Sequence, residues 1–187
     1  MIKTVGILGG GQLARMLAQA GQPMGLEFVF LDPAEDACAA EFGQHICADW
    51  DDESALKQLG QHSDVVTFDF ENVPESSASL IESMCPVYPP PRALHESQDR
   101  LREKTMMQEL GIEVAPFYPV ASRPELIAAV EQIGMPCVLK TRRFGYDGKG
   151  QMVLRFEEDM ERAWQQLGDF ELICELLPGA FHVLFET

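Results

Sequence analysis

The first 32 residues carry the pattern of a strand, a helix and a second strand, and this unit constrains the fold more than any other feature of the chain. Apolar runs at residues 4–8 and 26–31 are typical of buried strands. The segment between them starts with consecutive glycines and becomes a helix, which Gly21 and Pro23 end. One face of that helix carries Leu13, Met16, Leu17 and Ala20. A helix that joins two such strands predicts a β-α-β unit and an α/β fold.

The turn after the first strand has a spacing that favours phosphate binding. Gly9-Gly10-Gly11-Gln12-Leu13-Ala14 reads Gly-x-Gly-x-x-Ala, and Asp32 closes the second strand. Free N–H groups and the helix dipole both favour an anion at a helix N-terminus. This pattern fits the dinucleotide fingerprint of NAD(P) or FAD proteins. Two other interpretations stay open, which are a different phosphate ligand and a tight turn that needs glycine only for packing.

The rest of the first half continues the α/β pattern. Residues 44–48 and 64–68 are predicted strands, and residues 53–59 are a predicted helix. Because ligands of open α/β sheets lie at the carboxyl ends of strands, we expect Glu71 and Asn72 to meet a ligand, with helix capping as the alternative. The proline-rich segment 86–91 stops helix and central strand alike. We therefore predict a domain boundary there, with domains at residues 1–95 and 96–187.

The second half has a different order of elements. Strand, helix, hairpin and helix in succession predict an α+β nucleotide clamp rather than a second β-α-β domain. The predicted helices span residues 99–110 (amphipathic and ended by Gly111), 124–133 and 157–167, and the predicted strands span residues 117–120, 136–140, 151–155 and 171–175.

A glycine-rich basic loop lies between two of these strands, at residues 140–151. It places Gly145, Gly148 and Gly150 among Lys140, Arg142, Arg143 and Lys149, in a chain whose formal net charge is −16. Glycines let backbone N–H groups approach an anion and lysines neutralise it, which predicts a phosphate-handling loop. A Walker loop is excluded, because this loop joins strand to strand and lacks Gly-Lys-Ser/Thr. An ordinary glycine-containing hairpin stays open.

Composition excludes several classes of protein. The excess of 30 acidic over 14 basic residues argues against nucleic-acid binding, and no apolar run reaches membrane-spanning length. Five scattered cysteines without a Cys-x-x-Cys pair favour reduced thiols and a cytoplasmic protein. The four histidines show no metal-binding spacing.

Four motifs in one order, spanning nearly the whole chain, resemble the N5-carboxyaminoimidazole ribonucleotide synthetase family of the ATP-grasp superfamily. They are Gly9-Gly10-Gly11-Gln12-Leu13, Phe68-Asp69-Phe70-Glu71-Asn72-Val73, Gln98-Asp99-Arg100-Leu101 and Phe144-Gly145-Tyr146-Asp147-Gly148-Lys149-Gly150-Gln151. The resemblance implies a Rossmann-like pre-ATP-grasp domain followed by an incomplete ATP-grasp domain. It also implies a homodimer that uses ATP and bicarbonate to carboxylate 5-aminoimidazole ribonucleotide in purine biosynthesis.

The resemblance assigns three groups of site residues. Those implied to bind ATP are Arg100, Lys140, Gly145, Gly148, Gly150, Gln151 and Glu175. Those implied to bind the ribonucleotide are Gly11, Gln12, Leu13, Glu71 and Asn72, and those implied to be catalytic are Tyr146, Asp147 and Lys149. Two residues depart mildly from the family pattern, since Lys149 stands where some relatives have arginine and Asp69 where glutamate is usual.

A larger departure concerns the last residues. Val183 stands where the family has a second glutamate, and the resemblance implies that the Mg²⁺ ligands lie in a further half, with no metal ligand in this chain. We therefore expect the 187-residue chain alone to be catalytically inactive or nearly so. The alternatives are a formate-dependent glycinamide ribonucleotide transformylase-like ligase, a nicotinamide-dependent oxidoreductase and a non-catalytic nucleotide-binding module.

Overall fold

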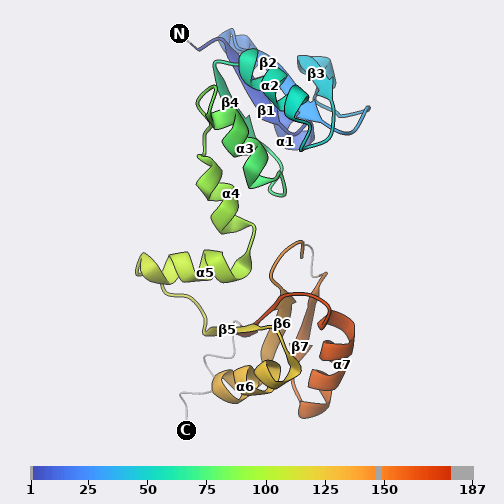
Figure 1. The fold of residues 1–187 in the computed structure, drawn as a ribbon, viewed down its shortest axis with the longest axis vertical. Coiled ribbons are helices and arrows are strands. Elements are labelled where there is room, and N and C mark those ends of the chain that lie inside the picture. The colour runs from blue at the N-terminus through green and yellow to red at the C-terminus, as the bar shows by residue number, and fades with distance from the viewer. Residues whose placement is uncertain (1, 146–148, 178–187) are drawn as a thin grey trace. The chain divides into compact units, whose positions relative to one another are not determined.

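A computed structural model describes residues 2–145 and 149–177 of the chain (Figure 1). The chain forms two compact units, Met1–Ser97 and Gln98–Thr187. The sequence-based division after residue 95 falls close to this boundary. No described helix is long and apolar enough to cross a membrane.

The first unit is a parallel sheet with helices, as predicted. Its four strands lie in the order β3-β2-β1-β4, and every pairing is parallel. The bounds are β1 (Thr4–Leu8), β2 (Glu27–Asp32), β3 (Gln44–Cys47) and β4 (Val65–Phe68), with α1 (Gln12–Gly21), α2 (Glu53–Gln61), α3 (Glu75–Glu82), α4 (Pro91–Ser97) and the 3₁₀ turns Gln22–Met24 and Ala40–Phe42. Because the strands run the same way, their carboxyl ends meet at one edge of the sheet.

Side chains alternate between the two faces of this sheet, as strand geometry requires. Ile7, Phe28 and Phe30 pack with α1 on one face. Leu8, Val29, Leu31 and Val66 form the other core with α2, α3 and α4. Both α3 and α4 were missed from the sequence. The structure also contradicts the expectation that the proline-rich segment breaks regular structure, because Val87 is buried in a parallel bridge to Val66 and Pro91 begins α4.

The apolar face of α1 is the exposed one. Leu13 is 60% exposed and Met16 54%, whereas Ala14, Ala18 and Gly21 are buried against the sheet. Large strand side chains fill this layer and leave room only for small helix residues. A Cβ atom at Gly21 would lie 2.5 Å from the Phe28 ring.

The second unit is an antiparallel sheet in the order β5-β8-β6-β7. Its bounds are α5 (Arg100–Glu109), β5 (Phe117–Val120), α6 (Arg123–Ile133), β6 (Cys137–Thr141), β7 (Gln151–Leu154), α7 (Glu157–Leu167) and β8 (Leu172–Leu176). One face packs against α6 and α7, through side chains such as Leu139, Leu154 and Cys174. The predicted hairpin is confirmed, since Lys140 at the end of β6 pairs with Gln151 at the start of β7.

Helix α5 forms where the sequence predicts it, but its predicted amphipathic character is wrong. None of its residues is buried. Polar contacts of its first turn hold the helix in place, as described below.

Candidate functional site

The first unit has a cavity at the carboxyl ends of its strands. Its volume is about 450 Å³, and it is lined by Gly11, Gln12, Leu13, Asp32, Pro33, Trp50, Asp69 and Phe70. Three of the five predicted ribonucleotide-binding residues are therefore in its wall. Ligands of open α/β sheets bind at this edge.

Two carboxylates hold the glycine turn of this cavity. The N–H of Gly10 donates to Asp32 Oδ2 at 2.8 Å, and the N–H of Ala34 donates to Asp32 Oδ1 at 2.8 Å. Gly9 has φ 120°, and a Cβ atom there would lie 1.4 Å from Asp69 Oδ1. The glycine at position 9 is thus required by the backbone conformation and by the close approach of Asp69.

Asp69 lies at the N-terminus of α1. Gly11, the N-cap residue of α1, has no side chain to cap the helix, and Asp69 Oδ2 instead accepts the N–H of Ala14 at 3.0 Å. Burial raises the pKa of the Asp69 carboxyl, and the negative charge of Asp32 adds to this, against the hydrogen bond from Ala14. Asp69 Oδ1 is buried and has no hydrogen-bond partner among the described residues. An anionic ligand would share the helix N-terminus with this carboxyl group.

An aromatic pair, which the sequence reasoning missed, also lines the cavity. The rings of Trp50 and Phe70 are stacked with centroids 5.7 Å apart. Ser77 Oγ, on α3, donates to the carbonyl oxygen of Trp50 at 2.6 Å and so fixes the backbone at that residue. The sequence offered one signal, an aromatic residue shortly after the third strand.

The predicted residues Glu71 and Asn72 follow β4 but are not in the wall of this cavity. Their side chains lie next to each other, with Asn72 Nδ2 3.5 Å from Glu71 Oε1. The alternative interpretation, helix capping, is wrong for both residues, because Pro74 is the N-cap of α3 and has no side-chain cap.

In the second unit, two lysines share one buried carboxylate. Glu175 is 3% exposed, and its side chain forms ion pairs with Lys140 and, at 2.8 Å, with Lys104. Burial opposes ionisation of Glu175, but the two ammonium groups outweigh it and hold the pKa of this carboxyl below its usual range. Lys140 and Glu175 were predicted, whereas Lys104 was missed. Its signal was its place on α5, one turn after Arg100.

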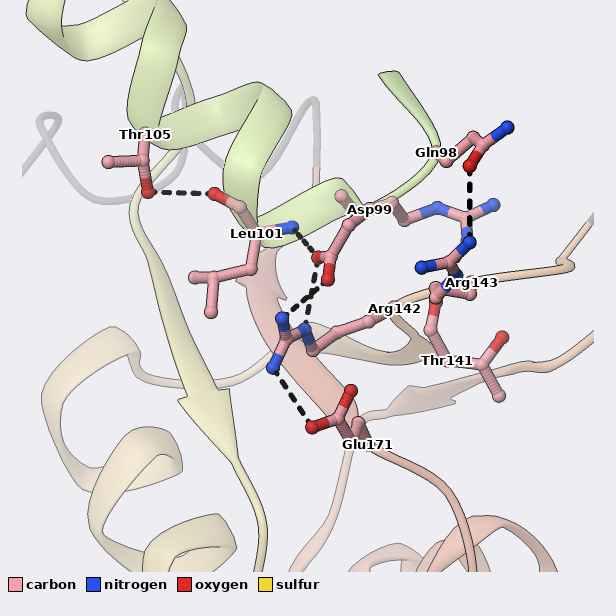
Figure 2. Close-up of polar contacts among 9 residues, drawn as sticks. Gln98, Asp99, Leu101, Thr105, Thr141, Arg142, Arg143 and Glu171 are labelled. Carbon is pink, nitrogen blue, oxygen red and sulfur yellow. Dashed lines mark hydrogen bonds and ion pairs between the residues drawn. The ribbon is translucent and has the colours of Figure 1, made fainter. Parts of the chain in front are cut away.

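A second ion cluster fixes the start of α5 (Figure 2). Asp99 is 1% exposed and accepts from Arg142 through both of its oxygens, with Nε 3.0 Å from Oδ1. Asp99 Oδ1 also caps α5 by accepting the N–H of Leu101 at 2.9 Å. Arg142 Nη1 lies 3.6 Å from Glu171 Oε1. Burial opposes ionisation of Asp99, but the hydrogen bonds from Arg142 and Leu101 hold its pKa below the usual range.

Arg100 binds the backbone of the basic loop. Its guanidinium donates to the carbonyl oxygens of Thr141 at 2.8 Å and Gly145 at 2.5 Å. At the other end of the loop, the N–H of Thr141 donates to the carbonyl oxygen of Gly150 at 2.8 Å. Gly150 has φ 68°, and a Cβ atom there would lie 2.7 Å from Thr141 Oγ1. Both ends of the loop are therefore fixed, and Arg100 positions the first of them.

The structure describes some of the remaining predicted loop residues and not others. Gln151 opens β7, and Lys149 is exposed. Tyr146, Asp147 and Gly148 lie outside the described residues, as does Val183. Across the described part of the chain, no three His, Cys, Asp or Glu side chains are grouped so that they could hold a metal ion.

Comparisons with known proteins give matches to both units. A family model of the ribonucleotide synthetase preATP-grasp domain matches residues 2–98, and an ATP-grasp domain model matches residues 105–177. The N5-carboxyaminoimidazole ribonucleotide synthase of Pseudomonas aeruginosa is 50% identical over 171 residues, which are 91% of this chain and 48% of that protein. The Staphylococcus epidermidis synthase is 41% identical, over 92% of this chain and 46% of its own length.

Solved structures show the same likeness. The ADP complex of the Staphylococcus aureus N5-carboxyaminoimidazole synthetase has a TM-score of 0.90 and 39% identity, covering 94% of this chain and 47% of that one. The Aspergillus clavatus synthase, in complex with ADP and 5-aminoimidazole ribonucleotide, has a TM-score of 0.83 and 27% identity, covering 94% and 46%. The chain spans about half the length of the curated relatives it matches. Its first unit matches the family model throughout, so the chain belongs to the ribonucleotide synthetase preATP-grasp family and continues into an ATP-grasp segment.

Proposed function

We propose that this chain carries the ribonucleotide site and part of the ATP site of an enzyme that carboxylates 5-aminoimidazole ribonucleotide. ATP and bicarbonate are the proposed co-substrates, and N5-carboxyaminoimidazole ribonucleotide is the proposed product. Because the chain spans about half the length of its curated relatives, the complete reaction, the use of bicarbonate and a homodimeric assembly are proposed for the whole protein. The cytoplasmic location is proposed as well, and the five free cysteines support it.

The observation that carries this proposal is the cluster of Lys140 and Lys104 on the buried carboxylate of Glu175. Two ammonium groups on one carboxylate leave a net positive charge at a site with little water, which suits a phosphate group. Lys140 would bind an ATP phosphate from the end of β6. Gly145 and Gly150 would bring backbone N–H groups close to the phosphates, between the ends that Arg100 and Thr141 hold. Relatives bound to ADP support the same ligand.

For the ribonucleotide, the cavity of the first unit is the proposed site. The N–H groups of Gln12 and Leu13, in the first turn of α1, would bind its phosphate. The stacked Trp50 and Phe70 would lie against its heterocycle. Burial raises the pKa of Asp69, and uptake of a proton by this carboxyl on phosphate binding would remove one of the two negative charges that oppose the phosphate.

The remaining assignments rest on the family resemblance. Glu71 and Asn72 would bind the ribonucleotide from the segment after β4. Tyr146, Asp147 and Lys149 would face the reacting groups. Mg²⁺ does not fit the described residues, because Glu175 is paired with two lysines and no acidic group of three is present among them. No step is therefore assigned to a metal on this chain, and we expect the 187 residues alone to bind nucleotide without carboxylating the ribonucleotide.

Calorimetric titration of the chain with ADP, ATP and NADH tests the proposal. We expect ADP and ATP to bind and NADH not to. Lys140→Met should weaken ATP binding about 30-fold or more, since a lost charge pair at a largely buried site costs about 2 kcal/mol or more. Lys57→Met is the matched control, because Lys57 pairs with Glu53 on the exposed surface of the other unit. Preferential binding of NADH, or unchanged ATP affinity in Lys140→Met, would contradict the assignment.

Among ligases, the formate-dependent glycinamide ribonucleotide transformylase is the alternative. The curated relatives favour the carboxylating enzyme. Titration with 5-aminoimidazole ribonucleotide and with glycinamide ribonucleotide separates the two, because only the first presents a heteroaromatic ring to Trp50 and Phe70. Tighter binding of glycinamide ribonucleotide would reverse the choice.

A further inference from the structure

Lys104 contacts the same carboxylate as Lys140, although it lies outside the four sequence motifs. Its ammonium group lies 2.8 Å from Glu175 Oε2, and its side chain is 20% exposed. The same ammonium group lies 5.8 Å from the centroid of the Phe117 ring. Phe117 is the direct partner of Glu175 in the pairing of β5 with β8. Lys104 is therefore held over the sheet by a charge and by an aromatic face.

The face of the sheet that carries this cluster follows from strand alternation. Leu139 and Cys174 point to α6 and α7, so Lys140 and Glu175, next to them in sequence, point to the opposite face. Helix α5 brings Lys104 to that face. The start of α5 is fixed by Asp99, through Arg142, and by Arg100, through the loop carbonyls. One turn later on the same side of the helix comes Lys104.

The charges around Glu175 indicate the role of Lys104. Its carboxylate is almost fully buried and has Lys140 on one oxygen and Lys104 on the other. When Lys140 turns to a phosphate oxygen, Glu175 loses one counter-ion. A buried carboxylate without any counter-ion takes up a proton instead of staying charged. With Lys104 in place, a counter-ion remains.

We propose that Lys104 is the positioning residue of the nucleotide site, which keeps Glu175 ionised and in place while Lys140 binds the ATP phosphates. This inference rests on the proposed ATP site. It assigns no contact between Lys104 and the reacting atoms. Its consequence is that nucleotide binding to the unchanged chain needs no proton for Glu175.

The test is calorimetric titration of the chain and of Lys104→Met with ATP. Each is measured from pH 6 to 8 and in two buffers of different ionisation enthalpy. In Lys104→Met, we expect ATP binding to take up close to one additional proton at neutral pH, because Glu175 must be neutralised. Affinity in this variant should fall as pH rises, by up to about tenfold per pH unit. A merely structural defect would weaken binding without this proton uptake.

Three further variants complete the test, and the first of them also covers the case in which Lys104→Met unfolds. Lys104→Arg retains the charge, so it should bind ATP within a few fold of the unchanged chain, without added proton uptake. The double variant Lys104→Met with Glu175→Gln has no carboxylate to neutralise, so the uptake should disappear. Lys57→Met is again the control for loss of an exposed lysine.

The possible outcomes distinguish the role of Lys104 from the proposed ATP site on which it rests. ATP binding by Lys104→Met that matches the unchanged chain, or that is weakened without proton uptake, would overturn the role of Lys104 and leave the ATP site standing. Proton uptake by Lys104→Arg equal to that of Lys104→Met would overturn it as well. If the unchanged chain binds neither ATP nor ADP, the nucleotide site itself is refuted, together with the role of Lys104.

Discussion

Removal of one partner of the contact between Asp99 and Arg142 should strongly destabilise the second unit. Asp99→Asn keeps an oxygen for the N–H of Leu101 but removes the charge that faces a largely buried guanidinium. Breaking a buried ion pair from one side costs about 3–5 kcal/mol. Because Glu171, 3.6 Å from Arg142, remains as a weaker partner, we expect about 3 kcal/mol for Asp99→Asn. Asp99→Ala also loses the helix cap, which adds about 1 kcal/mol.

Urea unfolding followed by tryptophan fluorescence measures this effect in the correct unit. Trp164 lies on α7 in the second unit and Trp50 lies in the first. In a Trp50→Phe background, tryptophan fluorescence therefore reports on the second unit alone. With an m-value of about 1–3 kcal/mol/M, Asp99→Asn should lower the urea midpoint by about 1–3 M. The matched control is Glu161→Gln, which breaks an exposed pair with Arg123 and should cost less than about 1 kcal/mol.

The pH dependence of this effect has a definite sign. The pKa of Asp99 is lowered in the folded unit, so the pair stabilises the fold fully above the unfolded pKa of about 3.9. That contribution is lost as pH falls through the lower, folded pKa. The cost of Asp99→Asn should therefore be constant from about pH 5 upward and shrink below about pH 4. An Asp99→Asn variant no less stable than Glu161→Gln at pH 7 would refute the reasoning.

Further predictions concern the glycine turn of the first unit, with thermal or urea unfolding followed through Trp50. Asp69→Asn should stabilise this unit at pH 7. The pKa of Asp69 is raised in the folded unit, so ionisation of this carboxyl lowers the free energy of unfolding as pH rises past about 4. A loss of stability at pH 7 would contradict this. Gly9→Ala should cost about 3 kcal/mol or more, since its Cβ would collide with Asp69 and its φ is 120°. Gly25→Ala, with φ 82° and no atom within 4 Å of the new Cβ, should cost only about 1 kcal/mol, and equal costs at the two glycines would rule out the close-approach argument.

Local patterns predicted most of the fold because their signals lie within a few residues. The glycine turn before α1 and the basic hairpin between β6 and β7 each combine an apolar run with a turn signal. Lys140 could be placed at the end of a strand for the same reason. By contrast, α4 begins inside a proline-rich segment, where composition argues against a helix, although proline is tolerated in the first turn of one.

The parts that the sequence did not predict depend on contacts between distant segments. Lys104 joins the site only through contacts with residues distant in sequence, since its ammonium group meets Glu175 of β8 and the Phe117 ring of β5. Asp69 binds the start of α1 from the carboxyl end of β4, 55 residues further along the chain. The exposed side of α1 could not be predicted either, since a helix with apolar residues on one face normally buries that face.

The small buried residues of α1 set how deep the cavity of the first unit can be. With only methyl groups at Ala14 and Ala18 and no side chain at Gly21, the helix axis can approach the sheet closely, and its first N–H groups then sit near the strand ends. A larger residue at either alanine would act as a spacer and lift the helix. The N–H groups would rise with it, while Asp32 would stay with β2 and Trp50 with Ser77 of α3. In the proposed ribonucleotide complex, the distance between the phosphate and the ring would thus depend on two side chains that do not line the cavity.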